Sequence, residues 1–340
     1  MKKIPNINDV AKRAGVAPIT VSRVINSSGY TSEETRQRVE TAIEALGYVP
    51  NTLARGLRSK RTNTLALVVT DITNPFFTLI ARGVEDAASA LGFTVIYCNT
   101  DESEAKEEKY INILVQKQVD GVLLVPACSN SKSVNFLHSN SIPIVLIDRS
   151  IPGNQTDLVR CDSENGAYSL IRHLIKLGHD RIAIITGPRG ISTSEDRVSG
   201  YLRALSDAGL EKLARVYYGT FTQTSGYELT VKALDVIPSP TALFGTNNFI
   251  SIGILKALRD MDISVPDETA VVGFDDLPTS MVVDPFLTVA AQPAYEMGQK
   301  ATELLVNRLN NKIPVEYQEI ILPTVLIERK SSGPRRVPSQ

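Results

Sequence analysis

The chain has 340 residues, of which 43% are hydrophobic and 21% are charged, as in a soluble globular protein. This length suits two or three units, each with a core of its own. No apolar run approaches the roughly 20 residues that a membrane-spanning helix needs, and the first residues turn polar too soon for a signal peptide. We therefore expect a cytoplasmic protein.

The cysteines and histidines give no sign of a metal site. Cys98, Cys128 and Cys161 are too few and too scattered for a disulfide framework, and no Cys or His lies at a metal-ligand spacing. We expect the three cysteines to be small buried hydrophobic residues, and we expect no metal and no cofactor.

The charge is unevenly distributed along the chain. Residues 1–62 hold 11 basic and 5 acidic side chains, which leaves 25 basic and 32 acidic side chains for the rest of the chain. A small basic segment before an acidic body is typical of a polyanion-binding module attached to another unit. A solvated basic face without a partner is the alternative that charge alone leaves open.

The first 50 residues predict three short helices. Asn6 can cap the first helix, Gly15 permits a tight turn, and Pro18 suits the first position of a second helix. Ser32 caps a third helix, which Gly47 ends. A glycine turn between the first two helices is typical of a helix-turn-helix unit.

A short basic segment, NTLARGLRSKRT, follows at residues 51–62. Asn51 can cap a helical turn on which Leu53 and Leu57 share an apolar side, while the arginines face away from it. A helix this short is marginal alone in water, so we expect it to form only together with a partner. The alternative is a flexible basic tether in which the leucines are incidental.

From Thr64 onward, buried strands alternate with amphipathic helices, which predicts a parallel α/β body in two similar halves. The first half has strands at 64–71, 93–100, 120–126 and 142–148, and helices at 76–91, 104–118 and 131–140. The second half has strands at 181–188, 215–219, 241–245 and 269–276, and helices near 195–209, 224–236 and 249–260.

The segments DVAKRAGV, TVSRVIN and ARGLRSKRT, at this spacing, resemble the DNA-binding head of the LacI/GalR repressors. The resemblance implies that the second helix lies in the major groove. By position, Pro18, Ile19 and Arg23 would read bases, and Thr20, Ser22 and Asn26 would contact phosphates. Arg23 can bind guanine through two hydrogen bonds. Ala17 departs from the serine that the family usually has, which removes a helix cap.

The same resemblance makes residues 51–62 a hinge helix. Two copies in a homodimer would lie in the minor groove of a palindromic operator, and Leu57 would wedge into the central base step. Asn51, Arg55 and Arg58 complete the predicted DNA-binding set.

The body resembles the type I periplasmic sugar-binding fold that forms the core of LacI/GalR proteins. The resemblance implies chain crossings between two lobes near residues 161, 291 and 323. The predicted domains are a helix-turn-helix at 1–50, a hinge at 51–62, a first lobe at 63–161 and 291–322, a second lobe at 162–290 and 323–330, and a disordered tail at 331–340.

Polar and aromatic residues follow the predicted strands in both halves. Such side chains meet in the cleft at the carboxyl ends of both sheets and suit a sugar, whose hydroxyls need paired polar partners and whose ring faces stack on phenyl groups. By resemblance to ribose-type binding proteins, hydroxyls would be bound by Asn74, Asp148, Arg149, Arg197, Asn247, Asp275 and Gln292, and the ring by Phe76, Phe77 and Phe221. Taken singly, each polar residue could instead shape a turn, cap a helix or pair on the surface. Asn248 departs from the family's usual aspartate.

The sequence thus predicts a homodimeric repressor controlled by a monosaccharide such as ribose. A sugar-binding protein without a DNA role is one alternative, and a regulator that uses a phosphorylated sugar or another small metabolite is a second. An enzyme of the Rossmann kind would need a G-x-G-x-x-G turn after a strand, which the sequence lacks, so we expect no enzyme.

Overall fold

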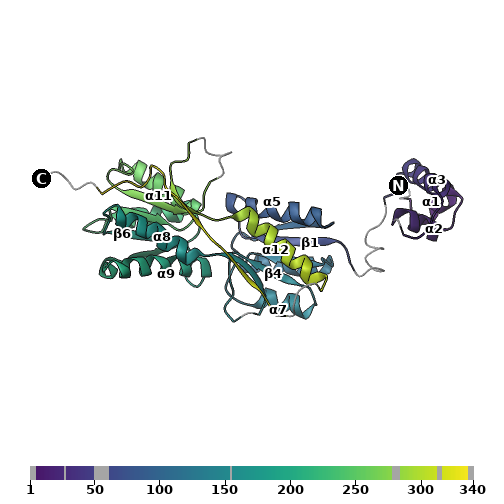
Figure 1. The fold of residues 1–340 in the computed structure, drawn as a ribbon, viewed down its shortest axis with the longest axis horizontal. Coiled ribbons are helices and arrows are strands. Elements are labelled where there is room, and N and C mark those ends of the chain that lie inside the picture. The colour runs from purple at the N-terminus through teal and green to yellow at the C-terminus, as the bar shows by residue number, and fades with distance from the viewer. Residues whose placement is uncertain are drawn as a thin grey trace. The chain divides into compact units, whose positions relative to one another are not determined.

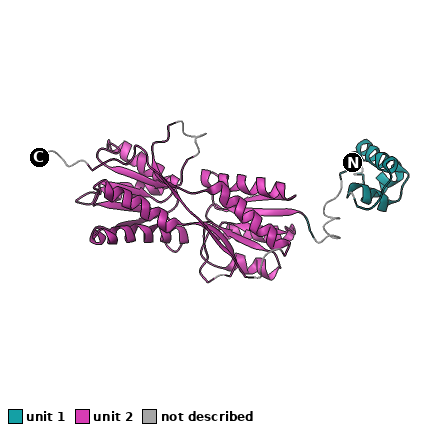
Figure 2. Ribbon diagram, viewed as in Figure 1, with its two compact units in different colours: residues 1–62 teal, residues 63–340 magenta. Residues whose placement is uncertain are grey.

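A computed structural model gives the fold of the chain in two compact units, residues 1–62 and 63–340 (Figure 2). It describes residues 5–26, 28–49, 61–153, 155–277, 284–311 and 316–335. Four members of the predicted DNA-binding set lie outside the described residues: Asn51, Arg55, Leu57 and Arg58.

The first unit is a small three-helix domain. Its helices are α1 (Ile7–Ala14), α2 (Pro18–Ile25) and α3 (Glu33–Leu46). Asn6 caps α1 in a capping box with Asp9, and Gly15 ends α1 with a φ of 68°, a left-handed conformation that glycine adopts without strain. The fully buried Val10, Val21 and one valine of α3 anchor a core shared by all three helices.

The second unit contains two sheets, each with six strands among the described residues and with helices on both faces (Figure 1). The first sheet has the order β11-β5-β4-β3-β1-β2, and all its pairs are parallel. Its strands are β1 (Thr64–Val69), β2 (Thr94–Asn99), β3 (Gly121–Leu124), β4 (Ile144–Ile147), β5 (Asp157–Cys161) and β11 (Glu319–Leu322).

The helices of this first lobe cover two separate hydrophobic cores. Helices α5 (Pro75–Ala90) and α12 (Ala294–Leu309) share one core with the sheet, while α6 (Glu104–Gln116) and α7 (Lys132–Ser139) share the other. Gly83 lets α5 approach α12 closely, because a Cβ atom there would lie 2.0 Å from the carbonyl oxygen of Tyr295. Strands buried on both faces explain the nearly continuous apolar runs of the sequence.

The second sheet repeats this plan with the order β12-β10-β9-β8-β6-β7, in which only the described β10–β12 pair is antiparallel. Helices α8 and α9 cover one core, and α10 and α11 the other. The strands are β6 (Ile182–Thr186), β7 (Arg215–Tyr218), β8 (Ala242–Gly245), β9 (Ala270–Phe274), β10 (Thr288–Ala291) and β12 (Val325–Ile327). The helices are α8 (Ser163–Lys176), α9 (Ser192–Asp207), a 3-10 turn η1 (Glu211–Leu213), α10 (Gln223–Leu234) and α11 (Asn248–Asp260).

The chain passes between the two lobes three times. It leaves the first sheet after β5, returns from β10 to α12, and leaves again between β11 and β12. The corresponding strands end at Cys161, Ala291 and Leu322. Three neighbouring crossings form a hinge about which two packed lobes can move as rigid bodies.

The predicted disordered tail is wrong for residues 331–335, which pack on the second lobe. Ser331 is fully buried, and its hydroxyl donates to the carbonyl of Val271 (2.6 Å) and accepts from the amide of Thr288 (2.8 Å). Further along, Arg335 forms an ion pair with Asp180 (2.7 Å). The polar composition of this segment suggested disorder, but its serines serve as hydrogen-bond partners for the ends of two buried strands.

No helix among the described residues combines the length and the apolar character that crossing a membrane requires.

We predict that Ser331→Ala lowers the free energy of unfolding by about 1–3 kcal/mol, because a buried amide and a buried carbonyl both lose their partner. Urea unfolding followed by circular dichroism measures the change. The exposed Ser206→Ala is the matched control, with a change within about 0.5 kcal/mol. Equal effects of the two substitutions would contradict this role of Ser331.

Candidate functional site

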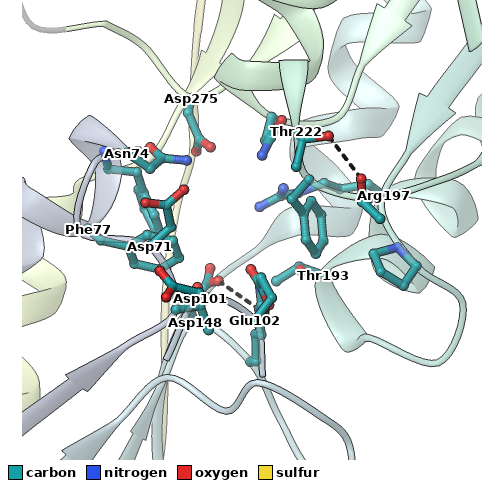
Figure 3. Close-up of a pocket in the computed structure, with 17 residues that line it drawn as sticks. Asp71, Asn74, Phe77, Asp101, Glu102, Asp148, Thr193, Arg197, Thr222 and Asp275 are labelled. Carbon is teal, nitrogen blue, oxygen red and sulfur yellow. Dashed lines mark hydrogen bonds and ion pairs between the residues drawn. The ribbon is translucent and has the colours of Figure 1, made fainter. Parts of the chain in front are cut away.

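A cavity of about 440 Å³ lies between the two lobes of the second unit, at the carboxyl ends of the parallel strands. Figure 3 shows Asp71, Asn74 and Phe77 on one side of this cleft and Thr193, Arg197 and Thr222 on the other. Nine of the ten residues predicted to bind a ligand line it: Asn74, Phe76, Phe77, Asp148, Arg149, Arg197, Phe221, Asn247 and Asp275.

Two buried aspartates occupy equivalent positions in the two lobes. Asp148 directly follows β4 and Asp275 directly follows β9. Both have left-handed backbones, with φ of 67° and 70°, a conformation that is unfavourable for residues other than glycine. Their amides donate to the carbonyls of Val159 (2.9 Å) and Ala290 (3.0 Å), so the neighbouring strands hold each strained turn in place.

Arg149 is 4% exposed and is held by a carboxylate that the sequence did not indicate. Its two terminal nitrogens donate to Glu102 at 2.6 and 2.7 Å, and one of them also donates to the carbonyl of Pro126 at 3.0 Å. Burial alone would lower the pKa of this guanidinium, but the nearby carboxylates, with Glu102 foremost, together outweigh burial and raise the pKa. Arg149 therefore stays charged and fixed in orientation.

Arg197 enters the cleft from α9 in the second lobe and is 3% exposed. It donates to the carbonyl of Thr246 at 2.6 Å, and its guanidinium lies 3.9 Å from the ring centre of Phe274. This cation–π contact and the hydrogen bond orient the guanidinium close to both aspartates, whose charges it partly balances.

Burial has the largest effect on the pKa of each of the two aspartates. It raises the pKa of Asp148 to about 6, although Arg197 and Arg149 act in the opposite direction. Burial also raises the pKa of Asp275, against the charge of Arg197 and a 2.5 Å hydrogen bond from the amide of Gln292. Burial removes the water that would solvate these carboxylates. Uncharged hydrogen-bond donors in its place would stabilise the ionised form of both aspartates and lower their pKa.

Four residues that line the cleft have a buried polar atom without a hydrogen-bond partner among the described residues: Thr70 Oγ1, Asp148 Oδ1, Arg149 Nε and Arg197 Nε. Unpaired polar atoms are costly in a protein interior, by about 1–3 kcal/mol each. A carboxylate acceptor, two guanidinium donors and a hydroxyl around one cavity suit a ligand with hydroxyl groups, because a hydroxyl both donates and accepts.

Aromatic rings form the apolar part of the cleft. Phe76 and Phe77 lie in the first turn of α5, are both 5% exposed, and meet edge to face with ring centres 5.1 Å apart. They belong to the core of the first lobe and also line the cavity. Phe221 comes from the second lobe, and the guanidinium of Arg149 lies 5.0 Å from its ring centre. Aromatic rings from both lobes thus line the same cavity as the polar groups.

Gln292 is the one predicted ligand-binding residue that does not line this cavity. It lines a smaller adjoining cavity of about 270 Å³, which shares Phe76 and Asp275 with the first. Its hydrogen bond to Asp275 makes it a support for that carboxylate.

Sequence reasoning missed eight residues that line the cleft. They also follow strands or begin helices, so the positional rule that found Asp148 could have found several of them. Two of them, Asp101 and Glu102, have left-handed backbones after β2, with φ of 51° and 57°. The eight residues are Thr70, Asp71, Asp101, Glu102, Pro188, Thr193, Thr220 and Thr222.

In the first unit, α2 turns most of the predicted DNA-contacting side chains outward. Pro18, Ile19, Arg23 and Asn26 are exposed, with Ile19 at 53%, while Thr20 and Ser22 are half-buried. Asn26 donates to the carbonyl of Ser22 at 2.7 Å. Ala17, at the cap position, makes no side-chain cap, and Pro18 occupies the first turn. The exposed face of α2 is therefore free to contact a partner.

Groups of three or more His, Cys, Asp or Glu side chains that could hold a metal ion are absent from the described part of the chain.

Two family descriptions match the sequence. "Periplasmic binding proteins and sugar binding domain of LacI family" matches residues 62–330, and "Bacterial regulatory proteins, lacI family" matches residues 6–51. The chain is 38% identical to the HTH-type transcriptional regulator DegA of Bacillus subtilis (strain 168), over 96% of this chain and 98% of that protein. It is 36% identical to a ribose operon repressor of Halalkalibacterium halodurans, over 96% of each.

A solved structure described as the transcriptional regulator CelR–cellobiose complex is also similar. It has a TM-score of 0.73 and 35% identity, over 96% of this chain and 99% of that chain.

We predict that Asp148→Asn stabilises the unliganded protein at neutral pH. The folded pKa of Asp148, about 6, lies above that of an unfolded aspartate, so its contribution to stability is complete below about pH 4 and is lost as the pH rises through about 6. Removing the charge should raise the free energy of unfolding by on the order of 2–3 kcal/mol at about pH 7.5 and by almost nothing near pH 4.

Urea titrations at the two pH values, with the exposed Asp235→Asn as control, measure this difference. A stabilisation of Asp148→Asn that is the same at both pH values would rule out an ionised, uncompensated Asp148.

Proposed function

This chain belongs to the LacI family of bacterial regulatory proteins, and we propose that it is a homodimeric transcriptional repressor whose operator affinity is set by an unphosphorylated sugar. The observation that carries the proposal is the presence, on one chain, of an outward-facing helix α2 and a buried cleft with unpaired hydroxyl-binding groups. A ribose-like monosaccharide is the proposed effector. Because its partner is DNA, the protein acts in the cytoplasm.

The DNA-binding role uses the exposed face of α2. Arg23 reads a guanine through its planar guanidinium, and Pro18 and Ile19 contact thymine methyl groups or select groove shape. The half-buried Thr20 and Ser22, with Asn26, bind phosphates. Two copies related by a two-fold axis then require a palindromic operator.

Self-association is supported by exposed apolar side chains on the first lobe. Strand β2 lies at one edge of the sheet formed by the described strands, and Ile96 and Tyr97 on it are 37% and 43% exposed. Leu91 and Tyr295, on elements that pack in the same lobe, are also exposed. An apolar sheet edge left open to water favours burial against a second copy.

The effector is proposed from the chemistry of the cleft. Asp148 and Asp275 accept hydrogen bonds from hydroxyls, Arg149 and Arg197 donate to them, and Phe221 packs on the face of the sugar ring. Asn74 and Asn247 add amide groups from the two lobes. Two of the similar proteins reported above, the ribose operon repressor and the CelR–cellobiose complex, have names that mention an uncharged sugar, which supports an uncharged ligand.

The charge of the cleft argues against a phosphorylated effector. Five carboxylates line it, against two arginines, and Arg149 already pairs with Glu102. A phosphate would therefore lie in a field of like charge, with Arg197 as the one lining arginine outside that pair. A neutral polyol avoids this repulsion.

Footprinting tests the function as a whole. We expect two-fold-symmetric protection of a DNA duplex that weakens with salt and is lost when residues 1–61 are removed, while sugar binding to the remaining body persists. A sugar-binding protein without a DNA role would give no protection in either form.

We predict that Arg23→Ala relaxes the sequence preference at one base pair in each half-site, with a loss of about 1–3 kcal/mol for the preferred base. Binding measurements on a set of single-base operator variants give this value. Arg38→Ala removes the same charge from the exposed surface of α3 and should weaken all sequences alike. If Arg23→Ala also weakens binding to all operator variants equally, Arg23 contacts phosphate and does not read a base.

We predict that D-ribose binds more than about 100-fold more tightly than D-ribose 5-phosphate. We also predict that Arg197→Ala abolishes the change in operator affinity that the sugar causes but leaves operator binding itself intact. Isothermal titration calorimetry compares the two ligands, and the exposed Arg189→Ala is the control. Preference for the phosphate would disprove the uncharged effector, and a retained response in Arg197→Ala would remove that residue from the site.

A further inference from the structure

We propose that Asn248 is a positioning residue that holds the two lobes together and fixes the direction in which Asn74 presents its amide to the ligand. The proposal rests on the proposed function only in naming that ligand a sugar. Asn248 does not line the cleft, so it acts through Asn74, to which its Nδ2 donates at 2.9 Å.

The contact joins the beginnings of two helices from different lobes. Asn74 caps α5 in the first lobe, and Asn248 is the first residue of α11 in the second. The two residues are 174 positions apart in the sequence, and they are 4% and 1% exposed. Since each belongs to a separately packed lobe, this hydrogen bond exists only while the lobes are at their present separation.

The surrounding hydrogen bonds settle the orientation of both amides. Asn74 Oδ1 accepts from the backbone N–H of Phe76 at 3.0 Å, as a helix cap must, and it accepts from Asn248 as well. With both bonds directed at this oxygen, the Nδ2 of Asn74 is the group left for the cleft. The ligand atom at this point must therefore be an acceptor, such as a hydroxyl or ring oxygen.

Reversing the Asn248 amide would place two oxygens against each other. Its own Oδ1 has no hydrogen-bond partner among the described residues, so the bond to Asn74 is the one side-chain hydrogen bond of Asn248 within the described part of the chain. An aspartate of the same shape could not donate in its ionised form.

The contact between the lobes and a contact with the cleft are made by neighbouring residues at the start of α11. Asn247, which lines the cleft and caps α11 through the amide of Ile250 (2.8 Å), precedes Asn248 directly. Three further contacts between the lobes are exposed or only partly buried: the amide of Ser150 donates to the hydroxyl of Ser192 (2.9 Å), the hydroxyl of Ser129 donates to the carbonyl of Gly190, and Arg160 pairs with Asp196 (3.4 Å). Water can replace these bonds more easily than the buried asparagine pair.

Hydrogen–deuterium exchange of the full-length, ligand-free protein tests the contact directly. In Asn248→Ala and in the isosteric Asn248→Asp, we expect peptides that cover the first turns of α5 and α11 to exchange about five- to tenfold faster than in the wild type. The exposed Asn112→Ala on α6 is the control and should leave this exchange unchanged. Titration with D-ribose should show an affinity reduced by a similar factor in both variants.

The two variants separate a hydrogen-bonding role from a packing role. If shape alone matters, Asn248→Asp behaves as the wild type and the proposal is overturned; it is also overturned if neither variant changes exchange in these turns. The exchange readout needs no ligand. A wild-type protein that ignores D-ribose would count against the proposed effector, and the contact would still be decided by exchange.

Discussion

The burial of Asp148 and Asp275 between the two lobes is the constraint on which the rest of the structure depends. Each carboxylate stands at the end of a central strand on a strained left-handed turn, and burial raises the pKa of both. Arg197 balances only part of this charge, and Asp148 Oδ1 has no partner among the described residues. The cleft therefore lacks hydrogen-bond donors for this carboxylate, and in the proposed function a hydroxyl-bearing ligand supplies them. Ligand binding and lobe closure become favourable together.

The architecture can carry this local event to other parts of the body. Three crossings at the ends of β5, β10 and β11 connect two lobes that each keep their own pair of cores. Such lobes move as rigid bodies, because their interiors are close-packed and only the crossings bend. The apolar edge of β2, which is the proposed dimer surface, belongs to the first lobe, so a rotation of this lobe would change how two copies meet there. The DNA-binding helices precede this lobe in the chain, and their paired spacing is the quantity that a repressor must control.

Much of this fold could be predicted from the sequence, because its signals are local. The cap at Asn6 and the alternation of strands and helices depend on neighbours along the chain, and the expected fold class is confirmed. The rule that strand ends converge also brought nine expected residues to one cavity. Pairings over long separations were missed. Glu102 pairs with Arg149, which lies 47 positions further along the chain. Ser331 forms hydrogen bonds with two strands of the second sheet, although the polar composition of its segment resembles that of a disordered tail. Asn248 stood out only as a departure from a pattern, and its partner is visible only once the lobes are in place.

Operator affinity measured with and without saturating D-ribose tests the central claim most directly. If closure of the cleft controls the DNA-binding unit, the affinity for a palindromic operator changes by about fivefold or more, in either direction, and operator DNA changes the affinity for the sugar by the same factor. Wild-type protein that binds both ligands, each with an affinity independent of the other, would contradict the account.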